Sequence, residues 1–387
     1  MSKRTFVLAL TMMVLLGLLC GSIAFAQQVA DIQRAIQRSG AGWVAGETSM
    51  TRLSPAERMK RVGLVLPKVT GKEKLLVPET KATPPYLDWR DNGGNYVTPV
   101  RNQGGCASCW AFATTAALES VTIISSRTPG VNLDLAEQIL LACSGAGNCE
   151  SGGSIDTASN YIHSTGLPLE SCYPYGGTNG NCGSACANWQ ASAYKIPSWS
   201  WVATTSPTVE AIKNALFTKG PLVSTMVVYD DFYAYTGGIY RYTTGNTAAN
   251  HAVLIVGYDD VSQYFIVKNS WGQGWGEAGY FKIAYSEMNS VVNFGDYTIA
   301  YGASNPACSS FLSQSFTSAG GTGSVSVSIP SGCSWTAESN NSWITISSGS
   351  SGAGDGMVVF SVSPPKKRPC QCSPWLSVPW LLMVWFY

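Results

Sequence analysis

The sequence predicts an α+β protein in which a helical part precedes a strand-rich part, with a smaller β module behind them. Three observations support this prediction. Apolar residues recur every third or fourth position between Cys109 and Ser125, which indicates a helix with one buried face. After about residue 195 short strands alternate with glycine turns, and from residue 306 Val alternates with Ser, Gly and Thr.

Composition supports a folded protein outside the cytoplasm. The chain has 387 residues, of which 45% are hydrophobic, enough for one large core and a second module. Only 12% of the residues are charged and the net charge is +1, so nothing indicates a nucleic-acid partner. Such a low content of charged residues is typical of extracellular proteins that are stabilised by packing and cross-links rather than by surface ion pairs.

Residues 1–26 have the pattern of a secretory signal peptide. Lys3 and Arg4 precede an apolar run over 6–20, and the small-residue site Ala24-Phe25-Ala26 follows. An uncleaved anchor is the weaker alternative, because the apolar run is short. We therefore expect a secreted protein, extracellular or in the cell envelope, whose cysteines form disulfides.

Residues 27–82, here called the N-terminal segment, are charged, contain several prolines and lack cysteine. Helices are predicted within 30–43 and 54–63, the second with Ser54 as cap and Pro55 in the first turn. A plain linker is the alternative. In a secreted enzyme we expect a removable propeptide that inhibits its own protein.

Residues 83–305 hold most of the aromatic residues and a dense set of cysteines. Ser108 is positioned to cap the helix that starts at Cys109, and a second helix fits LDLAEQILLAC at 133–143. The first half of this region is therefore predicted to be helical and the second half mostly β.

The stretch NQGGCASCWAF (102–112) places Cys106 and Cys109 in a C-x-x-C spacing. A redox pair of the thioredoxin type needs a preceding strand, and none is predicted. A zinc site needs four ligands, but the chain has two histidines and exported thiols usually oxidise. Neither a metal nor another cofactor is predicted.

Seven cysteines lie between residues 83 and 303, so one thiol stays free if the others pair. Cys109 is the candidate, because backbone N–H groups and the dipole at a helix N-terminus stabilise a thiolate. No acidic residue precedes Glu119 in that helix. An inert buried thiol would also fit the position.

A reactive thiolate needs a base and a group that orients the base. His163 lies in a polar helical stretch and is predicted at the surface, whereas His251 starts a strand. If Tyr258 pairs with Gln263 across a tight turn, Asn269 lies about one position from facing His251. The amide oxygen can then fix the imidazole tautomer, although a core histidine with an amide partner is the alternative.

These residues fall within a longer resemblance. Residues 83–303 resemble the papain family of cysteine proteases, whose cysteine motif and distant His and Asn are the ones found here. The matching stretches are LDWR (87–90), TPVRNQGGCASCWAF (98–112), LAEQILLAC (135–143), YPYGG (173–177), GPL (220–222), GGIY (237–240), NHAVLIVGY (250–258) and NSWGQGWGEAGYFKI (269–283).

The resemblance implies a papain-like two-lobed fold, with a helical left domain and a β-barrel-like right domain. It implies Cys109 as nucleophile, His251 as general base and then acid, Asn269 as the group that orients it, and Gln103 as oxyanion donor. The implied reaction is peptide hydrolysis through an acyl-enzyme.

By the same resemblance, Trp271 shields the Asn–His bond from water and Trp275 lines the leaving-group side. Gly152 and Gly153 match the pair whose backbone aligns an extended polypeptide substrate. Two departures stand out. Ala107 replaces the glycine usually found two residues before the nucleophile, and CESGG (149–153) contains one extra residue.

Three disulfides complete the implied domain. The resemblance pairs Cys106 with Cys149 and Cys143 with Cys182, which leaves Cys172 and Cys186 for each other. Sequence alone allows 15 connectivities for six cysteines.

Residues 306–363 look like a BACON-type β-sandwich, in which Cys308 and Cys333 are expected to pair. Contact with carbohydrate or mucin through this module is a hypothesis from fold analogy alone. The tail 364–387 fits neither neighbour, and its apolar end is too short to span a bilayer.

Two functions compete at this stage. One is a secreted cysteine endopeptidase, made as a zymogen and cleaved near residues 81–84. The other is a catalytically inactive secreted binding or adhesion protein on the same fold. Retention of Gln103, Cys109, His251 and Asn269 favours the enzyme.

Overall fold

The computed structural model describes residues 27–302 apart from 72, 74 and 78–81, and then 321–327, 334–339, 343–353, 356–363 and 383–386. The predicted signal peptide, the Cys308–Cys333 pair and most of the tail lie outside the described residues. The chain divides into two units, residues 1–303 and 304–387, and each is considered by itself.

The N-terminal segment contains both predicted helices. The first covers residues 27–39 and the second is α2 (Pro55–Met59). Ser54 caps α2 through a capping box, in which its hydroxyl accepts from Glu57 N–H while the Glu57 carboxylate accepts from Ser54 N–H. The cap that the sequence predicts at Ser54 is therefore confirmed.

The helical half of the first unit holds α3 (Cys109–Ser126), α4 (Glu137–Cys143) and α5 (Ile155–Ser164). Helix α3 begins at the predicted residue, but the predicted cap is wrong. The Ser108 side chain makes no bond to the first turn and instead hydrogen-bonds the Tyr175 hydroxyl at 2.8 Å. Helix α4 is shorter than predicted, because residues 133–136 precede it in non-helical backbone.

The strand half is built on one eight-stranded sheet with the order β5-β12-β6-β9-β10-β11-β8, and β2 pairs with β9 beside that path. The strands of this sheet are β2 (Tyr86–Asp88), β5 (Trp199–Ala203), β6 (Leu222–Tyr229), β8 (Ile239–Tyr240), β9 (Thr247–Asp259), β10 (Tyr264–Lys268), β11 (Tyr280–Ala284) and β12 (Thr298–Tyr301). Helix α6 (Val209–Lys219) packs against it.

The remaining elements of this unit are short. They are β1 (Val44–Ala45), which pairs with β7 (Tyr235–Gly237), β3 (Gly147–Asn148), which pairs with β4 (Gly152–Gly153), and the 3-10 turns η1 (Glu170–Cys172), η2 (Cys182–Ser184), η3 (Trp189–Ser192), η4 (Asp230–Ala234) and η5 (Tyr285–Asn289).

The predicted turn between β9 and β10 is wrong. Tyr258 faces Phe265 rather than Gln263, so the pairing is shifted: Asp259 pairs with Tyr264 across the four residues 260–263, and a bulge follows between Ile266 and Val267. Lys268 then faces Leu254, which leaves Asn269 further along the hairpin from His251 than the sequence suggested. The His251 imidazole nevertheless lies within hydrogen-bond distance of the Asn269 side chain.

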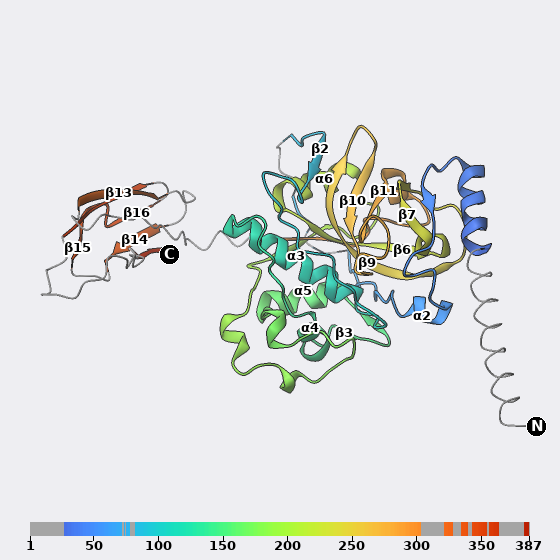
Figure 1. Cartoon of the computed structure of the whole chain (residues 1–387), viewed down its shortest axis with the longest axis horizontal. Helices are drawn as coiled ribbons and strands as arrows, with labels where there is room; N and C mark the ends of the chain where they lie inside the picture. The colour runs from blue at the N-terminus through green and yellow to red at the C-terminus, as the bar shows by residue number, and fades with distance from the viewer. Residues whose placement is uncertain are drawn as a thin grey trace, which may run out of the picture. The chain divides into compact units, whose positions relative to one another are not determined.

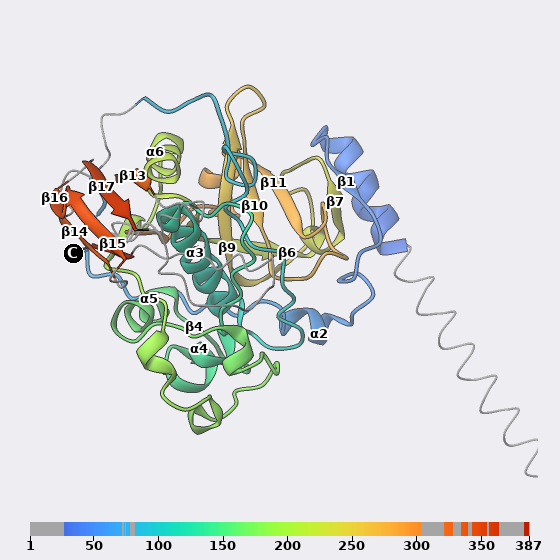
Figure 2. The same ribbon diagram turned by 60° about the vertical axis from the view of Figure 1, so that its left-hand side comes forward.

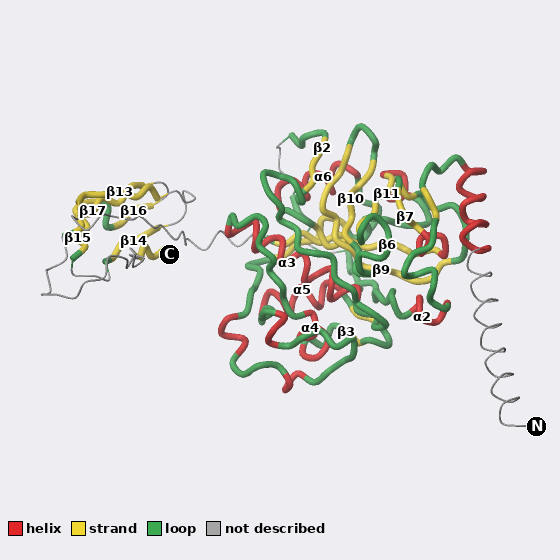
Figure 3. The backbone as a smooth tube through the Cα atoms, viewed as in Figure 1, coloured by secondary structure: helices red, strands yellow, loops and turns green. Residues whose placement is uncertain are grey.

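Figures 1 and 3 show the helices α3, α4 and α5 on one side of the first unit and the strands on the other. Helix α3 packs along β9 and β6, and the two parts share one continuous core. The N-terminal segment, blue in Figures 1 and 2, runs past β7 and on towards α2. The predicted order, helical first and β second, is confirmed.

The second unit forms two three-stranded sheets, with the orders β13-β17-β15 and β16-β14-β18. Their strands are β13 (Gly321–Val327), β14 (Ser334–Glu338), β15 (Ile344–Ser348), β16 (Ser351–Ala353), β17 (Gly356–Val362) and β18 (Met383–Phe386). The predicted β module is confirmed, and β18 shows that part of the tail pairs with β14.

Candidate active site

Cys109 opens α3 and is the one free cysteine among the described residues. Its thiol is fully buried, and burial raises its pKa to about 11, because a thiolate would lose its hydration. Backbone hydrogen bonding at Ala252, Trp110 and Gly63 lowers the pKa of the thiol and partly offsets that effect. In this covered state Cys109 is a neutral thiol.

His251 lies in β9, next to Ala252, and is joined to Asn269 by a hydrogen bond of 2.8 Å between Nε2 and Oδ1. Ser270 N–H donates to the same amide oxygen at 2.8 Å, which identifies that atom as an acceptor. Nε2 must therefore carry the proton, and Nδ1, which is buried and has no partner, presents its lone pair. This is the tautomer that a general base needs.

Burial lowers the pKa of His251 to about 4, whereas the hydrogen bond to Asn269 raises it. Trp271 covers the imidazole with ring centroids 4.9 Å apart, and it is itself almost fully buried. Trp275 packs edge-on against Trp271 and donates to Tyr233 O, so it lies beneath the site with no exposed surface.

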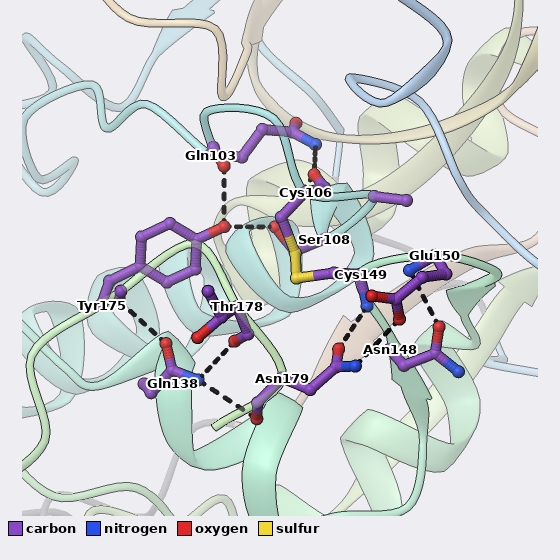
Figure 4. Close-up of a disulfide and its surroundings, with 12 residues drawn as sticks. Gln103, Cys106, Ser108, Gln138, Asn148, Cys149, Glu150, Tyr175, Thr178 and Asn179 are labelled. Atoms are coloured by element: carbon purple, nitrogen blue, oxygen red, sulfur yellow. Dashed lines mark hydrogen bonds between the residues drawn. A yellow bond between two sulfur atoms is a disulfide. The ribbon is translucent and has the colours of Figure 1, made fainter. Parts of the chain in front are cut away.

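Gln103 is held at both ends of its amide. Nε2 donates to Cys106 O at 2.8 Å, and Oε1 accepts from Ser270 Oγ at 2.7 Å. Figure 4 shows the first of these bonds beside the Tyr175 hydroxyl, which donates to Gln103 O at 2.7 Å. Because an amide nitrogen carries two hydrogens, Gln103 keeps one donor for a further acceptor.

Gly152 and Gly153 form β4, and the N-terminal segment lies directly against them. Gly153 N–H donates to Gly63 O at 3.0 Å, and Val65 N–H donates to Gly153 O at 2.9 Å. A Cβ on Gly152 would lie only 1.7 Å from Gly63 O, so a side chain here would prevent this approach. The two glycines therefore bind an extended backbone.

The N-terminal segment also reaches the histidine side of the site. Gly63 and Leu64 donate their N–H groups to Asn250 O at 3.2 and 3.1 Å, and Trp271 Nε1 donates to Arg61 O at 2.9 Å. Residues 61–65 thus pass over Cys109, bonded on one side to β4 and on the other to the start of β9.

The three predicted disulfides, Cys106–Cys149, Cys143–Cys182 and Cys172–Cys186, are all present. His163 is exposed, as predicted. Sequence reasoning missed Tyr175 and Ser270, which hold the Gln103 loop. Tyr175 stands in the quoted YPYGG stretch, but nothing in that stretch indicates its partner.

No group of three or more His, Cys, Asp and Glu side chains suited to a metal ion occurs within the described parts of the chain. None of the helices described there is long and apolar enough to cross a membrane.

The comparisons with known proteins agree with the arrangement of Cys109, His251 and Asn269 in this site. Residues 83–301 match the papain family cysteine proteases, and residues 309–366 match the viral BACON domain. A cathepsin L-like proteinase of Fasciola hepatica is 40% identical over 214 residues, which are 54% of this chain and 63% of that protein. Zingipain-2 of Zingiber officinale is 35% identical over 227 residues, covering 57% of this chain and 98% of its own length.

The structures of two digestive procathepsins from Tenebrio molitor larval midgut are similar. The one titled procathepsin L2 proteinase has a TM-score of 0.62 and 29% identity, covering 72% of this chain and 90% of its own. The one titled procathepsin L 3 has a TM-score of 0.59 and 27% identity, covering 72% and 89%. On the extent of the family match and the fold, the chain belongs to the papain family of cysteine proteases and carries a C-terminal BACON domain.

Proposed function

We propose that the protein is a secreted cysteine endopeptidase, made as a zymogen whose N-terminal segment, residues 27–82, is the inhibitory propeptide. One observation carries the proposal: residues 61–65 are backbone-bonded to Gly153 and Asn250 directly over the free thiol of Cys109. A segment in that place excludes polypeptide substrates until it is removed.

After removal, the proton of Cys109 passes to His251 Nδ1, and the thiolate attacks the carbonyl carbon of the substrate. Gln103 Nε2 and Cys109 N–H are the donors for the resulting oxyanion. His251 then protonates the leaving amine, which leaves a thioester on Cys109. The same imidazole takes a proton from water, whose oxygen attacks the thioester and releases the acid and the thiol.

Export rests on the pattern of residues 1–26 and agrees with the three disulfides, which persist in oxidising compartments. The comparisons give no support to contact with carbohydrate or mucin through the BACON domain, and an isolated module that binds no glycan would exclude it.

The test is titration with an epoxysuccinyl peptide, an electrophile for activated thiols, before and after acid-induced removal of residues 27–82. With its pKa near 11, the covered thiol is ionised to only about one part in 10⁴ at pH 7, so the full-length protein should label slowly. The mature protein should label stoichiometrically at Cys109.

His251→Ala should abolish this labelling in the mature protein, whereas His163→Ala, a change at the exposed histidine, should leave it intact. If the folded mature protein does not label at Cys109, the proposal is wrong and the inactive binding protein takes its place.

A further inference from the structure

Strand β5 lies at one end of the large sheet, with β12 on one side of it. Within the described residues, its other edge has no further strand of the sheet beside it. The residues of β5, Trp199–Ala203, include neither a charged side chain nor a proline, the features that commonly keep a free edge from pairing with another chain. This edge is therefore suited to pair with a further extended segment.

The N-terminal segment uses this edge. Leu75 forms a parallel bridge with Trp201, and Leu76 N–H donates to Trp201 O at 2.6 Å. Leu76 is partly buried and packs against the core, whereas the next residue, Val77, is 80% exposed. Residues 75–76 thus pair with β5 as a short added strand does.

This contact is separate from the one in the groove. Residues 61–65 lie over Cys109, and the exposed Leu66 follows them. Further on, the Glu73 carboxylate accepts from the N–H of Gly71 at 2.8 Å, a bond within the segment itself. The β5 contact is therefore a second attachment, made after an exposed connection.

Residues 61–65 are thus attached on both sides. Before them in the chain, the buried Trp43 donates to Arg241 O at 2.9 Å. After them, Leu76 donates to Trp201 O. A segment bound at several points rebinds quickly when one point opens, because the remaining contacts keep its effective concentration high. The β5 contact should therefore lower the fraction of time for which the groove is uncovered.

We infer that the free edge of β5 is a second binding site for the N-terminal segment, and that residues 75–76 bound there keep residues 61–65 over Cys109. The inference rests on the proposed function and adds a means of regulation: inhibition depends on a sheet edge outside the groove. The occupant is an extended backbone that donates to Trp201 O and places a leucine against the core.

The first experiment compares Leu76→Asp with Val77→Asp in the full-length protein. Both changes add one negative charge, but Leu76 is partly buried against the core and Val77 is exposed. Iodoacetamide reacts with the Cys109 thiol while the groove is open. We expect Leu76→Asp to speed this alkylation about fivefold, the scale of one hydrogen bond. Val77→Asp, a surface change, should alter it less than about twofold.

Leu76→Pro tests the hydrogen bond by itself. Proline has no N–H to donate to Trp201 O, while its side chain stays apolar. We expect alkylation of Cys109 to accelerate about threefold to fivefold in this variant. In Leu76→Asp, where the N–H is kept, hydrogen exchange at residue 76 should accelerate, because the bond to β5 is lost.

The mature protein provides the folding control. Residue 76 is absent once residues 27–82 have been removed, so matured Leu76→Asp should label with the epoxysuccinyl peptide as wild type does. Alkylation rates in Leu76→Asp and Leu76→Pro that match Val77→Asp would overturn the inference and leave the proposed function intact. Absence of epoxysuccinyl labelling at Cys109 in mature wild type would instead overturn the proposed function, whatever the alkylation rates of the full-length variants.

Discussion

The two halves of the peptidase unit are held together by different means. All three of its disulfides lie in the helical half, between Cys106 and Cys186, whereas residues 195–302 contain no cysteine. The strand half relies on its sheet and on a cluster of fully buried aromatic rings, namely Phe232, Tyr235, Tyr240, Trp275 and Phe281.

The difference extends to the active site and to the N-terminal segment. Cys109 stands three residues after a disulfide, while His251 and Asn269 depend on the β9–β10 hairpin and on Trp271. The N-terminal segment adds its own strand β1 and its Trp43 to the strand half, where covalent support is lacking. Strand β1 and Trp43 therefore reinforce the half that the disulfides do not reach, whereas residues 61–65 contact both halves at the active site.

Removal of the Cys106–Cys149 disulfide should have the largest effect on stability. It closes a loop with a sequence separation of 43, against 14 for Cys172–Cys186. The loop-entropy relation gives about 4 kcal/mol for the former and about 3 kcal/mol for the latter. We expect Cys106→Ala/Cys149→Ala to lower the free energy of unfolding in urea by more than Cys172→Ala/Cys186→Ala does.

The first pair of substitutions should also reduce epoxysuccinyl labelling of Cys109, because it frees the backbone of residues 106–108 directly before the nucleophile. The second pair, further from Cys109 along the chain, is the matched control. Equal losses of stability and of labelling in the two variants would contradict the contrast between them.

Trp43→Ala tests the support of the strand half. The indole is almost fully buried, donates to Arg241 O at 2.9 Å and packs 5.3 Å from the Tyr240 ring. Loss of a buried Trp costs about 3 kcal/mol or more, and hydrogen exchange in the full-length protein should therefore accelerate in β7 and β8. Exchange in α3 and α4 should stay unchanged.

Val44→Ala is the control, since Val44 is exposed in the same strand β1 and its loss should change little. Acceleration spread evenly over both halves after Trp43→Ala would show that the N-terminal segment does not favour the strand half.

Asn269→Ala tests the histidine side of the site in the mature protein. Without the amide oxygen, Nε2 loses its acceptor and both tautomers of His251 become accessible. General acid–base catalysis contributes about 10²–10⁴-fold, so we expect kcat/KM to fall by about 100-fold. The limb of the pH profile that reports His251 should move to lower pH, because the bond to Asn269 raises the pKa of the imidazole.

Asn160→Ala provides the control for this change, since Asn160 accepts from Trp199 at the surface, far along the chain from the hairpin. A loss of activity in Asn269→Ala with an unmoved pH profile would mean that the amide acts on folding rather than on the imidazole.

Much of this architecture is predictable because it depends on local rules. The start of α3, the capping box around Ser54 and the partial alternation of buried positions in β17 follow from residues close together in sequence. The predicted single buried face of α3 is wrong, because the helix is buried on nearly all sides, while Ile124 is only partly buried. The cap at Ser108 and the turn after Tyr258 were mispredicted for a nonlocal reason. The Ser108 hydroxyl is taken by Tyr175, 67 residues away, and β9–β10 contains a bulge that no periodicity reveals.

The candidate site divides in the same way. Cys109 stands out through an odd cysteine count and a helix start, and His251 and Asn269 through neighbouring strands and family resemblance. The position of residues 61–65 over Cys109 had no such signal, because it depends on backbone bonds to Gly153 and Asn250. Only the fold brings those segments together.

Tyr175→Phe is expected to have the smallest effect, and it tests whether the helical half positions the oxyanion donor. The Tyr175 hydroxyl bridges Ser108 Oγ and Gln103 O, and burial raises its pKa to about 12, so it remains a donor at working pH. Removal of one such bond costs about 1 kcal/mol, which predicts a fall in kcat of about fivefold with little change in KM.

The Tyr173→Phe variant is the control, because the Tyr173 hydroxyl binds Asn181 at the surface. A merely structural role for Tyr175 would lower the unfolding temperature of the mature protein while leaving kcat unchanged. A fall in kcat without loss of stability would instead show that the disulfide-linked half also sets the position of Gln103, so that both halves contribute to the geometry of the reaction.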